Sequence, residues 1–195
     1  MPESYSEIVV AAPMLLVKGF VAGVLVGEGL DPREVLFGEE LPLKHAGLGE
    51  MLAEWMRFHQ HESRLLVPQP MHADLRRRLD QASTVIGLKV VSDRKVMSAS
   101  CSFTFHVFAR RQLEDFNALL AEMKDRLRVS EDYEPTVIED AGAQGIELYS
   151  PAHAFEATGH GSVTGDLRST LEFHRRASGF GWVQVGQCQL NHADD

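Results

Sequence analysis

The sequence predicts an α+β protein built on an antiparallel sheet of the split β-α-β (ferredoxin-like) type, with room for a second such sheet packed against the first. Two observations carry this prediction. From Ser63 onward, strand and helix patterns follow in the order β-α-β-β-α and lead into an extended segment near 133–139. The stretch 96–108 also alternates between apolar and polar residues, which is typical of a strand with one buried face.

The middle of the chain supplies the elements of this unit, which we place at 63–140. We expect strands and helices at the following positions: a strand over 63–67, a helix over 69–82, a strand over 84–91, a polar turn at 93–95, a strand over 96–108 and a helix over 112–127. The last helix is the clearest, because its apolar residues from Leu113 to Leu127 recur at helical spacing.

The two ends of the chain, 1–62 and 141–195, are predicted to complete the second sheet together. In 1–62 we expect a strand at 8–11, a helix starting near Pro13, a strand at 34–37 and a helix ending near His61. In 141–195 we expect strands at 145–149, 153–163 and 182–190 around a helix from Asp166, which is placed as its N-cap, to Ser178. No sequence repeat relates the two sheets, so this duplication depends on element order alone.

The apolar segment from Ile8 to Val26 raises the question of a membrane span. Gly19, Gly23 and Gly27 form a ladder that is typical of close helix packing. Lys18 in its centre, Pro13 and the acidic flank argue against insertion. We therefore expect no membrane partner, and instead a helix packed against a sheet or against a subunit.

The charge of the chain excludes one class of partner. It carries 28 acidic and 19 basic side chains, for a formal net charge of −9. Duplex-DNA binders gain affinity mainly by neutralising phosphates, so we expect no duplex DNA. However, residues 61–111 sum to +5, between 1–60 at −5 and 112–147 at −7. Either these blocks compensate one another on the folded surface or the basic segment attracts an anionic small molecule.

Cysteine usage indicates the compartment. Cys101 and Cys188 have neither metal-ligand spacing nor a C-x-x-C arrangement, and the start of the chain does not resemble a secretory signal. Two such thiols predict a reducing, cytoplasmic location.

Alternation along two predicted strands gives a candidate catalytic group. Glu156 and His160 project from one face of the extended segment 153–163, and His106 projects from the polar face of 96–108. If these faces converge, a carboxylate and two imidazoles are available for general acid–base chemistry or for a metal site. The alternative is two polar surfaces that face solvent or a subunit.

Two further motifs are candidate binding sites. Gly159, Gly161 and Gly165 lie in a glycine-rich stretch before a helix, a context that suits phosphate or cofactor binding, although a tight turn before a capped helix is the preferred explanation. His59 and His61 form the densest histidine cluster and are candidate metal ligands. Their alternative is a polar helix end whose imidazoles contact the last carbonyl groups. No motif identifies a cofactor.

Three functions follow, in order of preference. The first is a non-catalytic small-ligand-binding or regulatory module that acts as a homo-oligomer, because no catalytic spacing stands out. The second is a hydrolase or isomerase that uses His106, Glu156 and His160. The third is an RNA-binding module, because 101–108 has phenylalanines at positions 3, 5 and 8 of the RNA-recognition octet, although it lacks the leading basic residue and both glycines.

Overall fold

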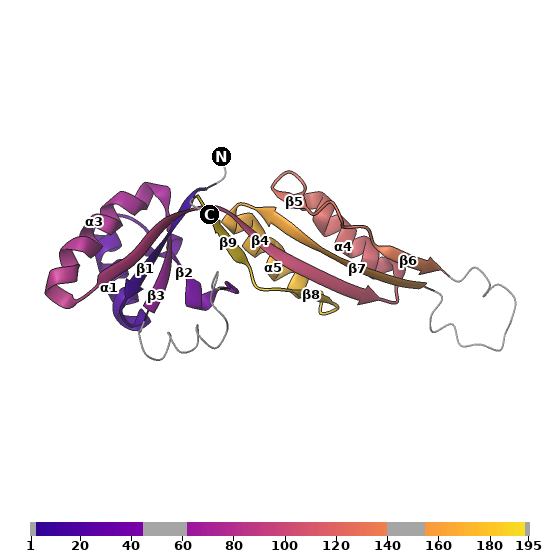
Figure 1. Cartoon of the computed structure of the whole chain (residues 1–195), viewed down its shortest axis with the longest axis horizontal. Helices are drawn as coiled ribbons and strands as arrows, with labels where there is room; N and C mark the ends of the chain where they lie inside the picture. Colours follow the sequence, from indigo (N-terminus) through magenta and orange to yellow (C-terminus); the bar gives the residue numbers. More distant parts are fainter. Residues whose placement is uncertain (1–2, 45–61, 140–154, 194–195) are drawn as a thin grey trace, which may run out of the picture. The chain divides into compact units, whose positions relative to one another are not determined.

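The computed structural model of the chain describes residues 3–44, 62–139 and 155–193. These residues form nine strands and four α-helices, and the strands join in one antiparallel sheet (Figure 1). The strand order is β2-β3-β1-β4-β7-β5, with β6 also paired to β7, and β8 and β9 paired to β4. The α+β prediction is confirmed. Within the described residues the strands belong to one sheet rather than to two packed sheets.

The chain divides into two compact units, and the division falls inside one strand. Unit 1 contains 1–98 and 189–195, and unit 2 contains 99–188. The strand β4 (Lys89–Val107) belongs to both units. We had predicted segment boundaries at 62/63 and 140/141 from the sequence. The division between the two units instead falls at Ser98/Ala99.

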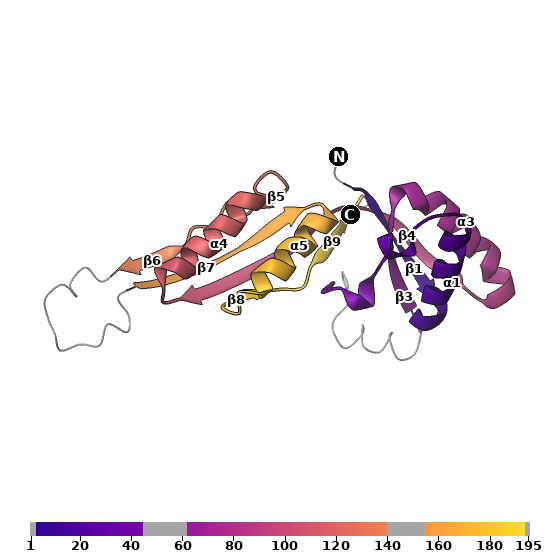
Figure 2. The same cartoon turned by 180° about the vertical axis from the view of Figure 1, so that it is seen from behind.

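Unit 1 packs aliphatic side chains between its sheet and two helices, α1 and α3 (Figure 2). Its elements are β1 (Tyr5–Ala11), α1 (Met14–Gly27), η1 (Pro32–Glu34), β2 (Leu36–Phe37), η2 (Gly38–Glu40), β3 (Glu62–Pro68), α3 (Gln69–Ile86), the first half of β4, and β9 (Gln189–His192). Ile8 and Val10 of β1 and Leu65 of β3 meet the buried faces of both helices in this core. The helix and strand expected at 48–61 and 145–149 lie outside the described residues.

The hairpin expected between 84 and 108 is wrong. The helix α3 continues to Ile86 and ends at Gly87, whose left-handed backbone (φ 74°) suits a residue without a side chain. The chain then forms one uninterrupted strand of 19 residues, in which Asp93, Arg94 and Lys95 pair with β1 instead of turning. Met97, expected in the core, is 59% exposed, because the alternation of buried residues shifts between Val96 and Ala99.

Unit 2 has an aromatic core beneath α4 and α5. Its elements are the second half of β4, α4 (Arg110–Met123), β5 (Leu127–Val129), β6 (Thr136–Glu139), β7 (Phe155–Gly165), α5 (Leu167–Ser178) and β8 (Val183–Val185). The ring of Phe103 lies 5.1 Å from that of Phe116 and 6.0 Å from that of Phe173, measured between centroids. The predicted N-cap is confirmed, since an Asp166 carboxylate oxygen accepts a 2.9 Å hydrogen bond from the Ser169 backbone N–H.

The helix α1 buries only one side of its apolar surface. Val17, Val21 and Leu25 are buried, whereas Leu15 is 85% exposed and Leu16 and Val26 are also exposed. No described helix combines the length and the apolar composition that crossing a membrane would require.

Candidate functional site

One face of the unit 2 sheet carries the polar side chains that the sequence singled out. In the antiparallel pairing of β4 with β7, residues that lie opposite each other point to the same side. We call this surface the polar face; its members are the cross-strand pairs Ser102–Ser162, Thr104–His160 and His106–Thr158, together with Glu156. The alternating phenylalanines of β4 point the other way, into the core, so the polar face is the side of the sheet away from α4 and α5.

The structure brings two of the three predicted catalytic residues together. His106 Nε2 lies 2.7 Å from a carboxylate oxygen of Glu156. The imidazole also contacts the Phe108 ring, with ring centroids 4.6 Å apart and an angle of 41° between the ring planes. The side chains of His106 and Glu156 are 52% and 35% exposed, so the pair is in contact with water. Such a pair orients an imidazole, but solvent screens its charges.

The third residue, His160, is a neighbour of this pair rather than a member of it. It lies opposite Thr104, the next residue along the same face of β4 from His106, and it is exposed. Within the described ranges, no three His, Cys, Asp or Glu side chains are grouped so that they could hold a metal ion. The polar face therefore presents a carboxylate, two imidazoles and several hydroxyl groups as a surface of hydrogen-bonding groups.

The glycine-rich stretch forms part of a strand instead of a loop. Gly159, Gly161 and Gly165 all lie within β7, where the backbone pairs with β4. A Cβ atom added to Gly159 would lie 2.5 Å from the ring of Phe105, and one added to Gly161 would lie 2.9 Å from the ring of Phe103. The first two glycines thus make room for the rings opposite them in the sheet.

The third glycine meets backbone instead of a ring. A Cβ atom on Gly165 would approach the carbonyl oxygen of Arg126 to 2.5 Å. All three positions therefore exclude a side chain because of packing, and the same sequence pattern needs no phosphate to explain it.

The aromatic strand does not present its rings as an RNA-binding sheet would. Phe103 and Phe105 are buried against α4 and Tyr133, and only Phe108 of the three is exposed. Base stacking requires aromatic faces on the open side of the sheet. The burial of these two rings removes the feature on which the RNA hypothesis depended.

The proposed metal ligands His59 and His61 lie outside the described residues. Nothing about their geometry enters the assignment of the site.

Several arginines of the basic segment 61–111 are paired with carboxylates. Arg78 contacts Glu28 of unit 1 at 2.6 Å, and Arg77 contacts Asp74 at 3.3 Å. Arg110, in unit 2, forms an ion pair with Glu139. Carboxylates near these arginines thus balance part of the positive charge of segment 61–111. This favours the interpretation that the charge blocks compensate one another on the folded surface.

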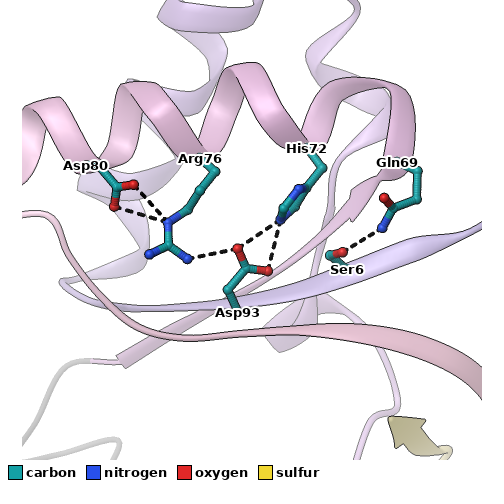
Figure 3. Close-up of polar contacts among 6 residues, drawn as sticks. All are labelled: Ser6, Gln69, His72, Arg76, Asp80 and Asp93. Carbon is teal, nitrogen blue, oxygen red and sulfur yellow. Dashed lines mark hydrogen bonds and ion pairs between the residues drawn. The ribbon is translucent and has the colours of Figure 1, made fainter. Parts of the chain in front are cut away.

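A polar cluster in unit 1 joins α3 to β4 (Figure 3). His72 Nε2 lies 2.9 Å from both carboxylate oxygens of Asp93, and an Arg76 guanidinium nitrogen lies 2.8 Å from one of them. The same guanidinium also donates to Asp80, one turn further along α3. The signal that could have pointed to this cluster is the four-residue spacing of His72 and Arg76, which places them on one helix face. We assigned Asp93 to a turn from the sequence and so missed it as the partner of these two side chains.

At the start of α3 the figure shows a second link to the sheet. The side-chain amide of Gln69 donates a 2.7 Å hydrogen bond to the Ser6 hydroxyl oxygen of β1. Together these contacts fix the helix on the strands by polar bonds along its edge, in addition to the aliphatic core.

Unit 1 also buries charge on the sheet face opposite its helices. Arg64 Nε lies 3.0 Å from one Glu7 oxygen, and His192 Nε2 lies 3.3 Å from the other. All three side chains are at most about one-tenth exposed. Burial lowers the pKa of the Arg64 guanidinium, an effect that the nearby Glu7 carboxylate opposes.

Comparison with known proteins identifies no family. No protein-family model matches the sequence, and no curated protein matches it. Among solved structures, the chain is similar to one described as the crystal structure of an unknown protein from Galdieria sulphuraria, with 13% identity over 99% of each chain and a TM-score of 0.28. A similarity at this level carries no argument about fold or function.

Proposed function

We propose that this chain is a non-catalytic small-ligand-binding or regulatory module that acts as a homo-oligomer in the cytoplasm, and that its ligand binds on the polar face of unit 2. The observation that carries the proposal is the exposed row of hydroxyl, imidazole and carboxylate groups on adjacent strands. A rigid sheet holds these groups at fixed spacing, so a ligand meets a preorganised set of donors and acceptors.

Strand order supports a split β-α-β plan for each unit. In unit 1 the order across the sheet is β2-β3-β1-β4, with α1 after β1 and α3 after β3. In unit 2, β5 and β6 lie beside β7, β7 lies beside β4, and β8 lies on β4, with α4 after β4 and α5 after β7. These orders support our proposal of a ferredoxin-like arrangement, whose helices leave one sheet face open.

The chemistry of the polar face favours a small anionic ligand. The hydroxyls of Ser102, Thr104 and Thr158 and the imidazole of His160 are donors that match carboxylate or phosphate oxygens. The Glu156 carboxylate is engaged by the His106 imidazole at 2.7 Å, which reduces its repulsion of an anion.

A thermal-shift screen with small carboxylates and phosphate monoesters tests this proposal. A ligand at 100 times its Kd is expected to stabilise the native protein by roughly 2.7 kcal/mol, seen as a higher Tm. The shift should be lost in His160→Gln and kept in His174→Gln, a matched control on α5. If no compound in the panel shifts Tm, or if the shift survives His160→Gln, binding at the polar face is wrong.

Self-association is supported by the exposed side of α1. Leu15, Leu16 and Val26 expose apolar surface, and the one charged residue within the helix, Lys18, forms an ion pair with Glu40. Contiguous exposed apolar surface is a feature of association sites on proteins. Sedimentation velocity should give a mass above 21.7 kDa for the wild type and a smaller species for Leu15→Glu. A wild-type monomer at high concentration would contradict self-association.

The enzyme hypothesis remains the second candidate, because His106 and Glu156 lie 2.7 Å apart. A carboxylate that orients an imidazole is the arrangement used for general acid–base chemistry. A screen with ester and phosphoester substrates should then detect turnover that disappears in His106→Gln. Turnover that survives this variant would exclude His106 as the catalytic base.

A further inference from the structure

The two cysteines lie against each other in unit 2, although 86 residues separate them in the sequence. Both are buried, at 3% exposed for Cys101 and 0% for Cys188. Cys101 is on β4 and faces the core, and Cys188 follows β8 in the segment that leads into β9. Neither thiol is part of the polar face.

Backbone and side-chain contacts fix the alignment of these two segments. The Gly186 backbone N–H donates to the Ser102 carbonyl oxygen at 2.8 Å, and the Asn191 side chain donates to the Ser98 hydroxyl at 2.9 Å. As the residue number rises from 186 to 191 on one segment, it falls from 102 to 98 on the other, so the two run antiparallel. Cys188 lies within the first interval and Cys101 within the second.

Both thiols are buried where these two segments run side by side. Adjacent strands are about 4.8 Å apart, a separation that brings facing cysteine side chains within reach of a disulfide. Two buried cysteines that are far apart cannot form a disulfide, whereas Cys101 and Cys188 lie on neighbouring segments and can.

We infer that Cys101 and Cys188 form a disulfide when the protein meets a hydroperoxide, and that the reduced pair is the resting state. First, one thiol loses its proton, and the thiolate attacks an oxygen of the peroxide. The O–O bond breaks, and the departing oxygen takes up that proton, which gives a sulfenic acid and water (or an alcohol from an organic hydroperoxide). The second thiol then attacks the sulfenic sulfur, its proton leaves with the hydroxyl group as water, and the S–S bond closes. In total, two protons and two electrons pass from the thiols to the peroxide, so the step is balanced.

The neighbouring Cys188 side chain and burial both raise the pKa of the Cys101 thiol, whereas the neighbouring Cys101 side chain lowers the pKa of Cys188. Whichever thiol is oxidised first, the other is placed to resolve it. Oxidant reaches Cys188 through local opening, because β8 and β9 on either side of it contain only three and four residues.

The proposal is tested by treating the full-length reduced protein with excess hydrogen peroxide. The expected product is a monomer that has lost two hydrogen atoms and both free thiols, with the peptides around Cys101 and Cys188 linked in a non-reducing digest. The oxidised protein should unfold at a higher temperature than the reduced one, because the bridge restricts the unfolded chain, and dithiothreitol should reverse the change.

Matched variants distinguish this bridge from general oxidation. Cys101→Ala and Cys188→Ala each lack the second thiol, so each should gain oxygen atoms instead of forming an intramolecular bridge. If the wild-type protein gains oxygen atoms without a linked peptide, forms only covalent dimers, or keeps both thiols free after prolonged exposure, the proposal is wrong.

Discussion

The two units share a strand order but differ in how they use the two faces of their sheets. Unit 1 has an aliphatic core and buries the charges of Glu7 and Arg64 on the other face. Unit 2 has an aromatic core seated on glycines and leaves its other face polar and exposed. Similar elements thus carry a closed, charge-paired surface in one unit and an open polar surface in the other.

The largest expected effect comes from breaking the buried ion pair of unit 1. Arg64→Met removes the partner 3.0 Å from Glu7 and leaves a carboxylate that is almost fully buried. We expect the free energy of unfolding to fall by about 3–5 kcal/mol. Chemical denaturation measures this change. The double variant Glu7→Leu with Arg64→Met should recover much of the loss, and a double variant as unstable as the single one would show that the charges are not the cause.

A smaller loss is expected where glycines seat the aromatic rings of unit 2. Gly159→Ala places a methyl group 2.5 Å from the ring of Phe105, and overpacking of this kind costs roughly 1–3 kcal/mol. The matched control is Gly23→Ala on α1, where a new Cβ atom meets no atom within 4 Å. That substitution should stabilise the protein by up to about 1 kcal/mol, because alanine favours a helix over glycine. If the free energy of unfolding changes in the same direction in both variants, packing against the Phe105 ring does not explain the glycine at 159.

The start of α5 offers a third test. Asp166 accepts the Ser169 N–H, whereas α1 and α3 follow Pro13 and Pro68 and have no side-chain cap. Asp166→Ala should lower the free energy of unfolding by about 1 kcal/mol. Asp166→Asn should keep most of the stability that the cap contributes, and thermal unfolding measures both changes. Equal losses in the two variants would mean that the charge of Asp166, rather than its capping hydrogen bond, is what matters.

The smallest effect is expected on the polar face. Glu156→Gln removes the exposed ion pair with His106, and such pairs contribute less than about 1 kcal/mol. Stability should therefore change little, while ligand binding on this face should change. A loss comparable to that of Arg64→Met would show that the pair is structural and not part of a binding surface.

Local patterns predicted most helices and the facing of His106 and Glu156, because both depend on periodicity within one element. They failed where a partner distant in sequence decides the structure. Asp93 to Lys95 resemble a turn, but β1 and the α3 side chains His72 and Arg76 hold the segment as a strand. Gly159 and Gly161 resemble a phosphate-binding loop until the rings of Phe105 and Phe103 are seen opposite them. Neither partner is visible in the local sequence.

The position of β9 has a consequence for the order in which the molecule is made. This strand pairs with β4, and His192 contacts Glu7, although the two residues lie at opposite ends of the sequence. A ribosome therefore releases the last part of unit 1 only after all of unit 2 has been synthesised. Until then, Glu7 and Arg64 lack their third partner, so a nascent chain completes its second unit before its first.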